Sequence, residues 1–385
     1  MKRLMQTLTR TALAAAIGFG LTATALAADL KVGLSVSLSG PNSSLGVPYA
    51  KGMQAALAYR PEVNGRKIQL IVLDDGSDPT TAGRNARKLV EEDKVDVLMG
   101  TSGVPAAIAM AQVGRDAKVP MIGLTPIQLD AAENPWVFTV AQPTQLMIDA
   151  VVQRMKKDGV KSVGYIGFSD AWGDLVYNAL MKSAPEAGIQ VLGNERYARA
   201  DASVTGQVLK LLAMKPDAVM TGGAGTPGAL PFLALTERGF KGPVYGQHGL
   251  INPDFVRVVG ASGQNALMPT GPVIVAEQLP DGYPTKKIAM DFRAAFQKVN
   301  NAPTSDAFSA YSFDGWLVFT DAAARAKGEP GTPEFRLSLR DAIASTKEVV
   351  GTHGVYNFKP GNLYGVDERA RVIVKLDNGQ WKLAP

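Results

Sequence analysis

One strand–loop–helix unit sets the plan of this chain. In the segment Lys31 to Ala58, apolar residues alternate with others up to Ser39-Gly40-Pro41, a loop of small residues follows, and a helical pattern begins near Pro48. Such a junction places free backbone N–H groups and hydroxyls side by side, which suits binding of a small polar or anionic group. Because units of this kind recur along most of the chain, we expect a scaffold that presents binding loops.

Further strands and helices alternate after this unit. Ile68 to Leu73 is a continuous apolar run, which is typical of a buried parallel strand. Asp78 and Pro79 are the residue types preferred at a helix N-cap and at the first helical position. The last part of the chain shows mainly helices, near 285–299, 308–326 and 332–345. The alternation predicts right-handed βαβ units and parallel sheets.

The length of 385 residues is enough for two compact domains. Domain boundaries are expected near Gln142, Pro269 and Gly351, and the run Met268 to Pro272 is predicted to be a linker. The late helices have almost no strands between them, so they make poor sense as a separate domain. We expect them to return to the first sheet and cover its faces.

The first 27 residues have the pattern of a secretory signal peptide. Three basic residues precede an apolar stretch from Ala12 to Leu26, and Ala25-Leu26-Ala27 matches a small–x–small cleavage site. We therefore expect cleavage after Ala27. The alternative, an uncleaved membrane anchor, fits poorly with so short an apolar core. The sequence has no cysteine, which leaves no disulfide and no Cys-linked lipid.

The charge of the chain argues against one class of partner. The formal net charge is +5, but three positive charges lie in the predicted signal peptide, so the mature chain is +2, with 37 basic and 35 acidic residues. No basic run with interleaved aromatic residues occurs, and no nucleic-acid partner is expected. Apolar residues make up 46% and charged residues 19% of the sequence, which argues against disorder.

Two local patterns could indicate chemistry, and each has a simpler explanation. Gly223 to Gly228 matches G-x-G-x-x-G, but the next strand ends without the acidic residue that would bind a ribose. A Gly-rich binding or packing loop is therefore favoured over a nucleotide site. Asp74, Asp75 and Asp78 cluster, yet adjacent strand residues point to opposite faces and Asp78 serves as a cap. A structural role is favoured for these aspartates.

No assembled catalytic set is visible in the sequence. His248 and His353 lie far apart and have no partners at zinc-binding spacing. Neither a G-x-S-x-G nucleophile elbow nor a P-loop occurs. We therefore expect no enzyme activity, no metal and no cofactor.

What remains is a set of loops at the carboxyl ends of the predicted strands, where open α/β sheets bind ligands. These loops supply small residues, hydroxyls and a few large aromatic side chains, as a small-molecule pocket does. They span residues 39–45, 101–104, 125–128, 168–172, 222–226 and 247–250.

With these loops in place, the chain resembles the periplasmic solute-binding proteins of branched-chain amino-acid ABC importers, the leucine/isoleucine/valine-binding type. The resemblance covers nearly the whole mature chain and rests on short motifs in order and spacing. These motifs are Ser39-Gly40-Pro41, Leu73 to Pro79, Gly100, Val119 to Ile122 and Trp172-Gly173.

The resemblance implies an α/β fold with two doubly wound parallel-sheet lobes joined by three crossovers, the type I periplasmic binding protein fold, which closes on its ligand. The three expected boundaries match these crossovers. Residues 28–142 and 270–350 would form lobe 1, and residues 143–269 and 351–385 would form lobe 2. The resemblance also implies a soluble, monomeric protein in the periplasm, with a small-molecule ligand and with the permease and ATPase subunits of an ABC importer as partners.

The site implied by the resemblance departs from that of the amino-acid binders. Those proteins hold the carboxylate and amine with a Ser at the place of Val104 and a Thr at the place of Ile127. An acidic residue at the place of His248 pairs with the ammonium. Here that acid is missing, and histidine cannot replace its charge-assisted bond to an ammonium. The expected site is also more apolar and aromatic, through Leu45, Val104, Ile127, Phe168 and Trp172.

We therefore favour an apolar or aromatic carboxylate over an α-amino acid. The runs Thr221 to Pro231 and Gln247 to Gly249 are similar to those of aromatic-acid binders that take up lignin-derived acids. Three alternatives remain: a transport protein for branched-chain or other amino acids, a ligand sensor of the same fold, and an exported enzyme. The expected ligand-binding residues are Ser39, Leu45, Ser102, Gly103, Val104, Thr125, Pro126, Ile127, Phe168, Trp172, Ala224, His248 and Phe308.

Overall fold

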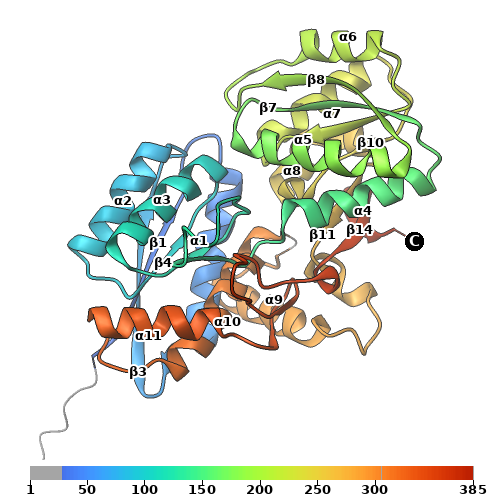
Figure 1. The fold of residues 1–385 in the computed structure, drawn as a ribbon. Coiled ribbons are helices and arrows are strands. Elements are labelled where there is room, and N and C mark those ends of the chain that lie inside the picture. Colours follow the sequence, from blue (N-terminus) through green and yellow to red (C-terminus); the bar gives the residue numbers. More distant parts are fainter. Residues whose placement is uncertain (1–27, 305, 385) are drawn as a thin grey trace, which may run out of the picture.

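The computed structural model describes residues 28–304 and 306–384, so the predicted signal peptide lies outside the described residues. The chain forms two α/β lobes, one built from the blue and orange segments and the other mainly from the green and yellow segments (Figure 1). Each lobe holds a sheet in which parallel strands dominate, which confirms the predicted α/β fold class. Among the described helices, none combines the length and apolarity needed to cross a membrane.

The sheet of lobe 1 has six strands in the order β2-β3-β1-β4-β5-β6. The central strand β1 pairs in parallel with β3 and β4, while β2 adds a short antiparallel edge. The strands are β1 (Leu30–Val36), β2 (Glu62–Val63), β3 (Arg66–Asp74), β4 (Val97–Gly100), β5 (Met121–Gly123) and β6 (Val137–Thr139). Because β1 is apolar and buried along nearly its whole length, it forms the core of this lobe.

Six helices cover the first sheet, and half of them come from the end of the chain. They are α1 (Ser43–Tyr59), α2 (Pro79–Glu91), α3 (Val104–Ala117), α9 (Lys286–Asn300), α10 (Phe308–Arg325) and α11 (Pro333–Ala344). The helix α10 packs along α1 and is buried on nearly all sides, and its buried residues are mostly apolar or aromatic. The late helices α9 and α10 both pack against α1 of this lobe.

The start of α1 was predicted wrongly. The helix begins at Ser43, and Pro48 lies inside it rather than at its start. The first turn lies directly on the end of β1, where a Cβ on Gly46 would be 1.9 Å from the Ser37 carbonyl oxygen. Only a glycine permits this approach. The loop after β1 is therefore shorter than expected, and Leu45 projects from a helix.

The aspartates after β3 have structural roles, as the sequence indicated. Asp78 caps α2, accepting a hydrogen bond from the Thr81 N–H at 2.7 Å, and this bond lowers the pKa of Asp78. The buried Asp75 accepts hydrogen bonds from the hydroxyls of Ser37, at 2.5 Å, and Thr101. In the described part of the chain, no group of three or more His, Cys, Asp or Glu side chains is arranged to hold a metal.

The sheet of lobe 2 has seven strands in the order β15-β14-β11-β10-β9-β7-β8. These are β7 (Ser162–Phe168), β8 (Gln190–Tyr197), β9 (Ala218–Gly222), β10 (Val244–Tyr245), β11 (Leu267–Thr270), β14 (Val372–Asp377) and β15 (Gln380–Leu383). Its helices are α4 (Thr144–Lys157), α5 (Ala171–Ser183), α6 (Thr205–Ala213), α7 (Leu230–Glu237) and α8 (Pro253–Val259).

The predicted linker at Met268 to Pro272 is wrong for most of its length, because it overlaps β11. Met268 pairs with Val374 of the antiparallel β14, and Leu267 pairs with Tyr245 of the parallel β10. Both partners are distant in sequence. The Pro, Thr and Gly residues of this segment are typical of a loop, but pairing with distant strands makes most of it a strand.

Buried polar contacts join the segments that pass between the lobes. Gln142 lies just after β6, Gly271 just after β11 and His353 between the short strands β12 (Val349–Val350) and β13 (Val355–Tyr356). Gln142 Nε2 lies 3.3 Å from His353 Nδ1, and Tyr311 stacks on the His353 ring with centroids 3.9 Å apart. The Tyr311 hydroxyl donates to Gln142. These contacts tie α10 to the crossing segments.

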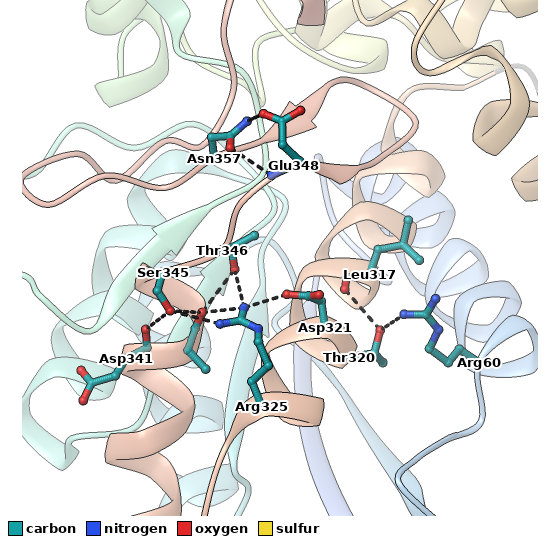
Figure 2. A network of polar contacts seen from close by, with 11 residues as sticks. Arg60, Leu317, Thr320, Asp321, Arg325, Asp341, Ser345, Thr346, Glu348 and Asn357 are labelled. Carbon is teal, nitrogen blue, oxygen red and sulfur yellow. Dashed lines mark hydrogen bonds and ion pairs between the residues drawn. The ribbon is translucent and has the colours of Figure 1, made fainter.

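The final crossing segment is held against lobe 1 before it enters the second sheet. Arg325 donates to Asp321 and to the Ala342 carbonyl at the end of α11, and to the Ser345 hydroxyl (Figure 2). Residues 351–364 were expected in lobe 2, but Tyr364 forms a bridge with Thr139 at the edge of the first sheet. The chain joins the second sheet only at β14.

Candidate functional site

A small cavity of about 20 Å³ lies between the two lobes. Most of the predicted binding residues line it, namely Leu45, Ser102, Gly103, Val104, Thr125, Pro126, Trp172, Ala224, His248 and Phe308. The structure adds Tyr49, Leu124, Arg199, Gly249 and Tyr311 to the lining.

The lobe 1 wall comes from two buried helices and two loops at the ends of strands. Tyr49 on α1 donates its hydroxyl hydrogen to the Leu124 carbonyl at 2.7 Å, which fixes the loop after β5. Its ring meets Phe308 edge to face, with centroids 5.4 Å apart. Burial raises the pKa of the Tyr49 phenol, so the ring stays neutral. At the N-terminus of α3, Gly103 is the N-cap and no side chain caps the helix.

The lobe 2 wall is organised around Trp172 in the first turn of α5. Asp170 caps this helix through its Oδ1 atom, which accepts from the Trp172 N–H at 2.9 Å. The indole Nε1 donates to the Gly223 carbonyl at 3.3 Å, and the same carbonyl accepts from the Gln247 side chain. The Gly-rich loop after β9 thus supplies a hydrogen-bond acceptor to Trp172, which lines the cavity, and to Gln247.

His248 is a buried histidine without a hydrogen-bond partner. Its side chain lines the cavity, only 3% of the residue is exposed, and neither ring nitrogen has a partner in the described structure. Burial lowers the pKa of His248 to about 3, so the ring is neutral near pH 7. A buried unpaired polar group costs about 1–3 kcal/mol. The imidazole is therefore available to a ligand as one donor and one acceptor.

Arg199 is the only charged residue among the described residues that line the cavity. Its Nε donates to Asp170 Oδ2 at 2.6 Å, and the guanidinium lies over the Phe168 ring, 4.2 Å from the centroid. Its Nη1 reaches across the cleft and donates to Asn42 Oδ1 at 2.8 Å. No acidic side chain lines the described cavity. The one charged group at the cavity wall is therefore a guanidinium, whose charge the Asp170 carboxylate balances from behind.

Three hydrogen bonds between the lobes show that the cleft is closed. Besides the bond between Arg199 and Asn42, the Thr226 N–H donates to the Ser44 hydroxyl at 3.2 Å. The Ala307 N–H donates to the Ile251 carbonyl at 3.1 Å. A molecule held in the cavity would therefore be enclosed by both lobes.

Three of the predicted residues do not line this cavity. Ser39 is exposed, and its hydroxyl donates to Asp74 at 2.7 Å. Ile127 is fully buried, and its carbonyl accepts from the Tyr364 hydroxyl. Phe168 is also fully buried and lies beneath Arg199. Of the three, Phe168 contributes indirectly, since its ring supports the guanidinium of Arg199.

Two features of the sequence could have identified the lining residues that were not predicted: the end of a strand and helical spacing. The edge strand β8 runs through polar residues to Tyr197, two positions before Arg199. The true end of β8 would have pointed to the loop that holds Arg199. Tyr49 and Tyr311 project from helices, four residues after Leu45 and three after Phe308. Helical spacing from these predicted residues would have found both.

Comparisons with known proteins give the chain a family. Residues 29–361 match the family model described as periplasmic binding protein. A solved extracellular ligand-binding receptor from Rhodopseudomonas palustris is 39% identical, with a TM-score of 0.89, and the match covers 93% of this chain and all of the receptor. A curated amino acid binding protein from Pseudomonas aeruginosa is 26% identical over 270 residues, which is 66% of this chain and 69% of that protein.

A more distant structure shares the fold. An ABC-transporter solute-binding protein from R. palustris, solved in complex with benzoate, has a TM-score of 0.76 at 21% identity, covering 92% of this chain and 95% of that protein. At this identity the likeness concerns the fold alone. The chain belongs to the periplasmic binding protein family, with the type I, leucine/isoleucine/valine-binding-protein-like fold.

Proposed function

We propose that the protein is the periplasmic receptor of an ABC importer, which encloses a small apolar carboxylate, in particular an aromatic acid, and delivers it to a membrane permease. The observation that carries this proposal is the polar content of the cavity. It offers the guanidinium of Arg199 and the unpaired ring of His248, and no described acidic side chain lines it. Export through the signal peptide 1–27 and a monomeric state belong to the same proposal.

The missing acid argues against an α-amino acid. A buried ammonium needs a partner that compensates for its lost hydration, and a carboxylate is the strongest one. The cavity offers an ammonium only uncharged acceptors, namely the neutral ring of His248 and the hydroxyls and backbone carbonyls of residues such as Ser102 and Thr125. A carboxylate, by contrast, can pair with the guanidinium of Arg199 in the cavity wall.

The apolar lining supports an aromatic ligand. Rings of Tyr49, Trp172, Phe308 and Tyr311 line the cavity, together with Leu45. Aromatic pairs contribute about 0.5–1.5 kcal/mol beyond area burial, in offset or edge-to-face arrangements. The R. palustris protein solved with benzoate shows that this fold accommodates such an acid.

An amino-acid receptor is the second candidate. It is favoured by the Pseudomonas relative described as an amino acid binding protein. Native mass spectrometry of freshly purified protein separates the two candidates, because a ligand enclosed by closed lobes is carried through purification. A co-purified aromatic or other apolar acid would support the proposal, and co-purified leucine, isoleucine or valine would support the second candidate.

A further inference from the structure

We infer that Arg199 selects the ligand by its negative charge, an inference that rests on the proposed function of the same cavity. The ligand carboxylate binds the guanidinium when the lobes close, and a neutral molecule of the same shape binds much more weakly. Arg199 thus determines specificity, in addition to bridging the lobes.

Arg199 is held in one orientation from behind. Asp170 uses its two oxygens for different tasks: Oδ1 caps α5, and Oδ2 accepts from Arg199 Nε at 2.6 Å. The Phe168 ring supports the planar guanidinium from one side at 4.2 Å. The side chain is 15% exposed, so little freedom is left to it. A donor fixed in this way loses little conformational entropy when it binds an anion.

Part of the guanidinium remains available. A guanidinium carries five N–H donors. Asp170 takes the Nε–H and Asn42 takes one Nη1–H, and Nη2 has no hydrogen-bond partner in the described residues. The free donors belong to a residue that lines the cavity. A carboxylate there forms charge-assisted hydrogen bonds, which contribute about 1.5–3 kcal/mol each.

The lobe 1 side of this contact is also suited to an anion. Asn42 lies beside Gly103, where an added Cβ would be 3.0 Å from Asn42 Nδ2. Gly103 begins α3, a helix without a side-chain cap, and helix N-termini favour negative charge. The unpaired imidazole of His248, buried in the same cavity, is an independent sign that a hydrogen-bonding ligand belongs here.

Matched pairs of acid and amide test this inference. Dissociation constants are measured by titration calorimetry for benzoate and benzamide, and for 4-hydroxycinnamate and its amide, in the parent and in Arg199→Gln. The loss of charge-assisted bonds should weaken acid binding by about tenfold or more. Amide binding should change little, so the acid-to-amide ratio of affinities falls.

Two further variants separate charge recognition from closure. Arg196→Gln is the matched control, since Arg196 lies three residues before Arg199, near the end of β8, and donates to the Phe168 carbonyl at 2.8 Å but does not line the cavity. It should leave the ratio unchanged. Asn42→Ala removes one of the hydrogen bonds between the lobes and should weaken acid and amide by the same factor. If Arg199→Gln does not fold, Arg199→Lys keeps the charge and should keep the preference for the acid.

The possible results distinguish a wrong role for Arg199 from a wrong proposed function. Equal weakening of acid and amide in Arg199→Gln, or a lost preference in Arg199→Lys, would show that Arg199 only helps closure, and the proposed function would stand. A parent protein that binds none of these acids, or binds only leucine, would overturn the proposed function and this inference together.

Discussion

The imidazole of His248 meets the indole of Trp172 edge to face, with ring centroids 5.4 Å apart and planes inclined by 83°. One ring follows β10 and the other begins α5, so two separate βα units of lobe 2 supply this pair. Trp172 has its Nε1 satisfied by Gly223, whereas both nitrogens of His248 are unpaired. The pair therefore combines a fixed apolar surface with hydrogen-bonding capacity.

A true ligand should stabilise the folded protein. A molecule enclosed between the lobes binds only the native state, so the melting temperature should rise with its concentration. At about 100 times the dissociation constant, the gain is about 2.7 kcal/mol. Thermal-shift measurements with benzoate, 4-hydroxycinnamate, phenylacetate and leucine check this. A shift with leucine alone would contradict the preference for an aromatic acid and leave the transport function standing.

Substitution of Trp172 should weaken aromatic ligands. Trp172→Ala removes the ring and should reduce affinity by about tenfold or more, since aromatic contact and burial are both lost. Trp172 is only 4% exposed, so this variant should also lower the melting temperature of the free protein. Trp172→Phe keeps a ring and should lose less affinity.

Trp316 provides the matched control for that experiment. It is fully buried on α10, and its Nε1 donates to the Arg60 carbonyl at 3.0 Å, but it does not line the cavity. Trp316→Phe should therefore lower stability and leave affinity unchanged. Equal affinity in Trp172→Phe, Trp172→Ala and the parent would remove Trp172 from the site.

His248 should make binding depend on pH. Burial lowers the pKa of His248 to about 3, and a bound carboxylate beside the ring would raise it. Binding then takes up a proton, so affinity should strengthen as pH falls from about 8 to about 5, while the ligand acid stays ionised. His248→Gln keeps a neutral donor and should show a flat profile. Identical profiles in both proteins would contradict the contact.

His248→Glu tests the same position with opposite charge. A glutamate there should repel a carboxylate and can pair with an ammonium, as the acid of the amino-acid binders does. Affinity for benzoate should fall, and affinity for leucine should rise or appear. Calorimetry with both ligands measures this, and unchanged values for both would mean that His248 does not contact the ligand.

Asp314 should affect the pH dependence of folding. Burial raises its pKa from 3.8 to about 6, although Thr352, His353 and Tyr356 donate hydrogen bonds to it. The native state then binds the proton more tightly than the unfolded state. This contribution to stability is fully present below about pH 4 and is lost as pH rises through about 6.

Asp314→Asn removes this titration. The difference in unfolding free energy between variant and parent should therefore shift in favour of the variant by about 1 kcal/mol when the pH is raised from about 5 to about 7.5. This shift is expected even if the substitution itself stabilises or destabilises the protein at both pH values. Denaturant unfolding at the two pH values measures the difference. A constant offset would contradict a raised pKa for this carboxyl group.

Replacement of Gly271 by alanine should destabilise the folded protein. A Cβ there would lie 1.8 Å from His353 Nδ1, so Gly271→Ala must push the crossing segments apart. We expect a loss of about 1–3 kcal/mol in unfolding free energy, as for overpacking in a core. Gly282→Ala is the control, because nothing lies within 4 Å of its added Cβ. Equal stability of both variants would contradict tight packing between the crossing segments.

The sequence by itself determined the fold class and much of the cavity. Alternating strands and helices need no tertiary information to be recognised, because their periodicity and their caps, such as Asp78, are local. Parallel strands also place their carboxyl ends at one edge, so loops such as the one ending at Val104 could be assigned to the site in advance. Trp172 and His248 were found for this reason.

Tertiary structure decided those features that depend on residues distant in the sequence. Met268 lies in a strand because β10 and β14 flank it, and Phe168 lies below the cavity because Arg199 covers it. The bond between Arg199 and Asn42 joins residues from different lobes, and no local pattern encodes it. Burial and pairing depend on the packing of the whole chain, so only the folded structure shows which polar groups are left for a ligand.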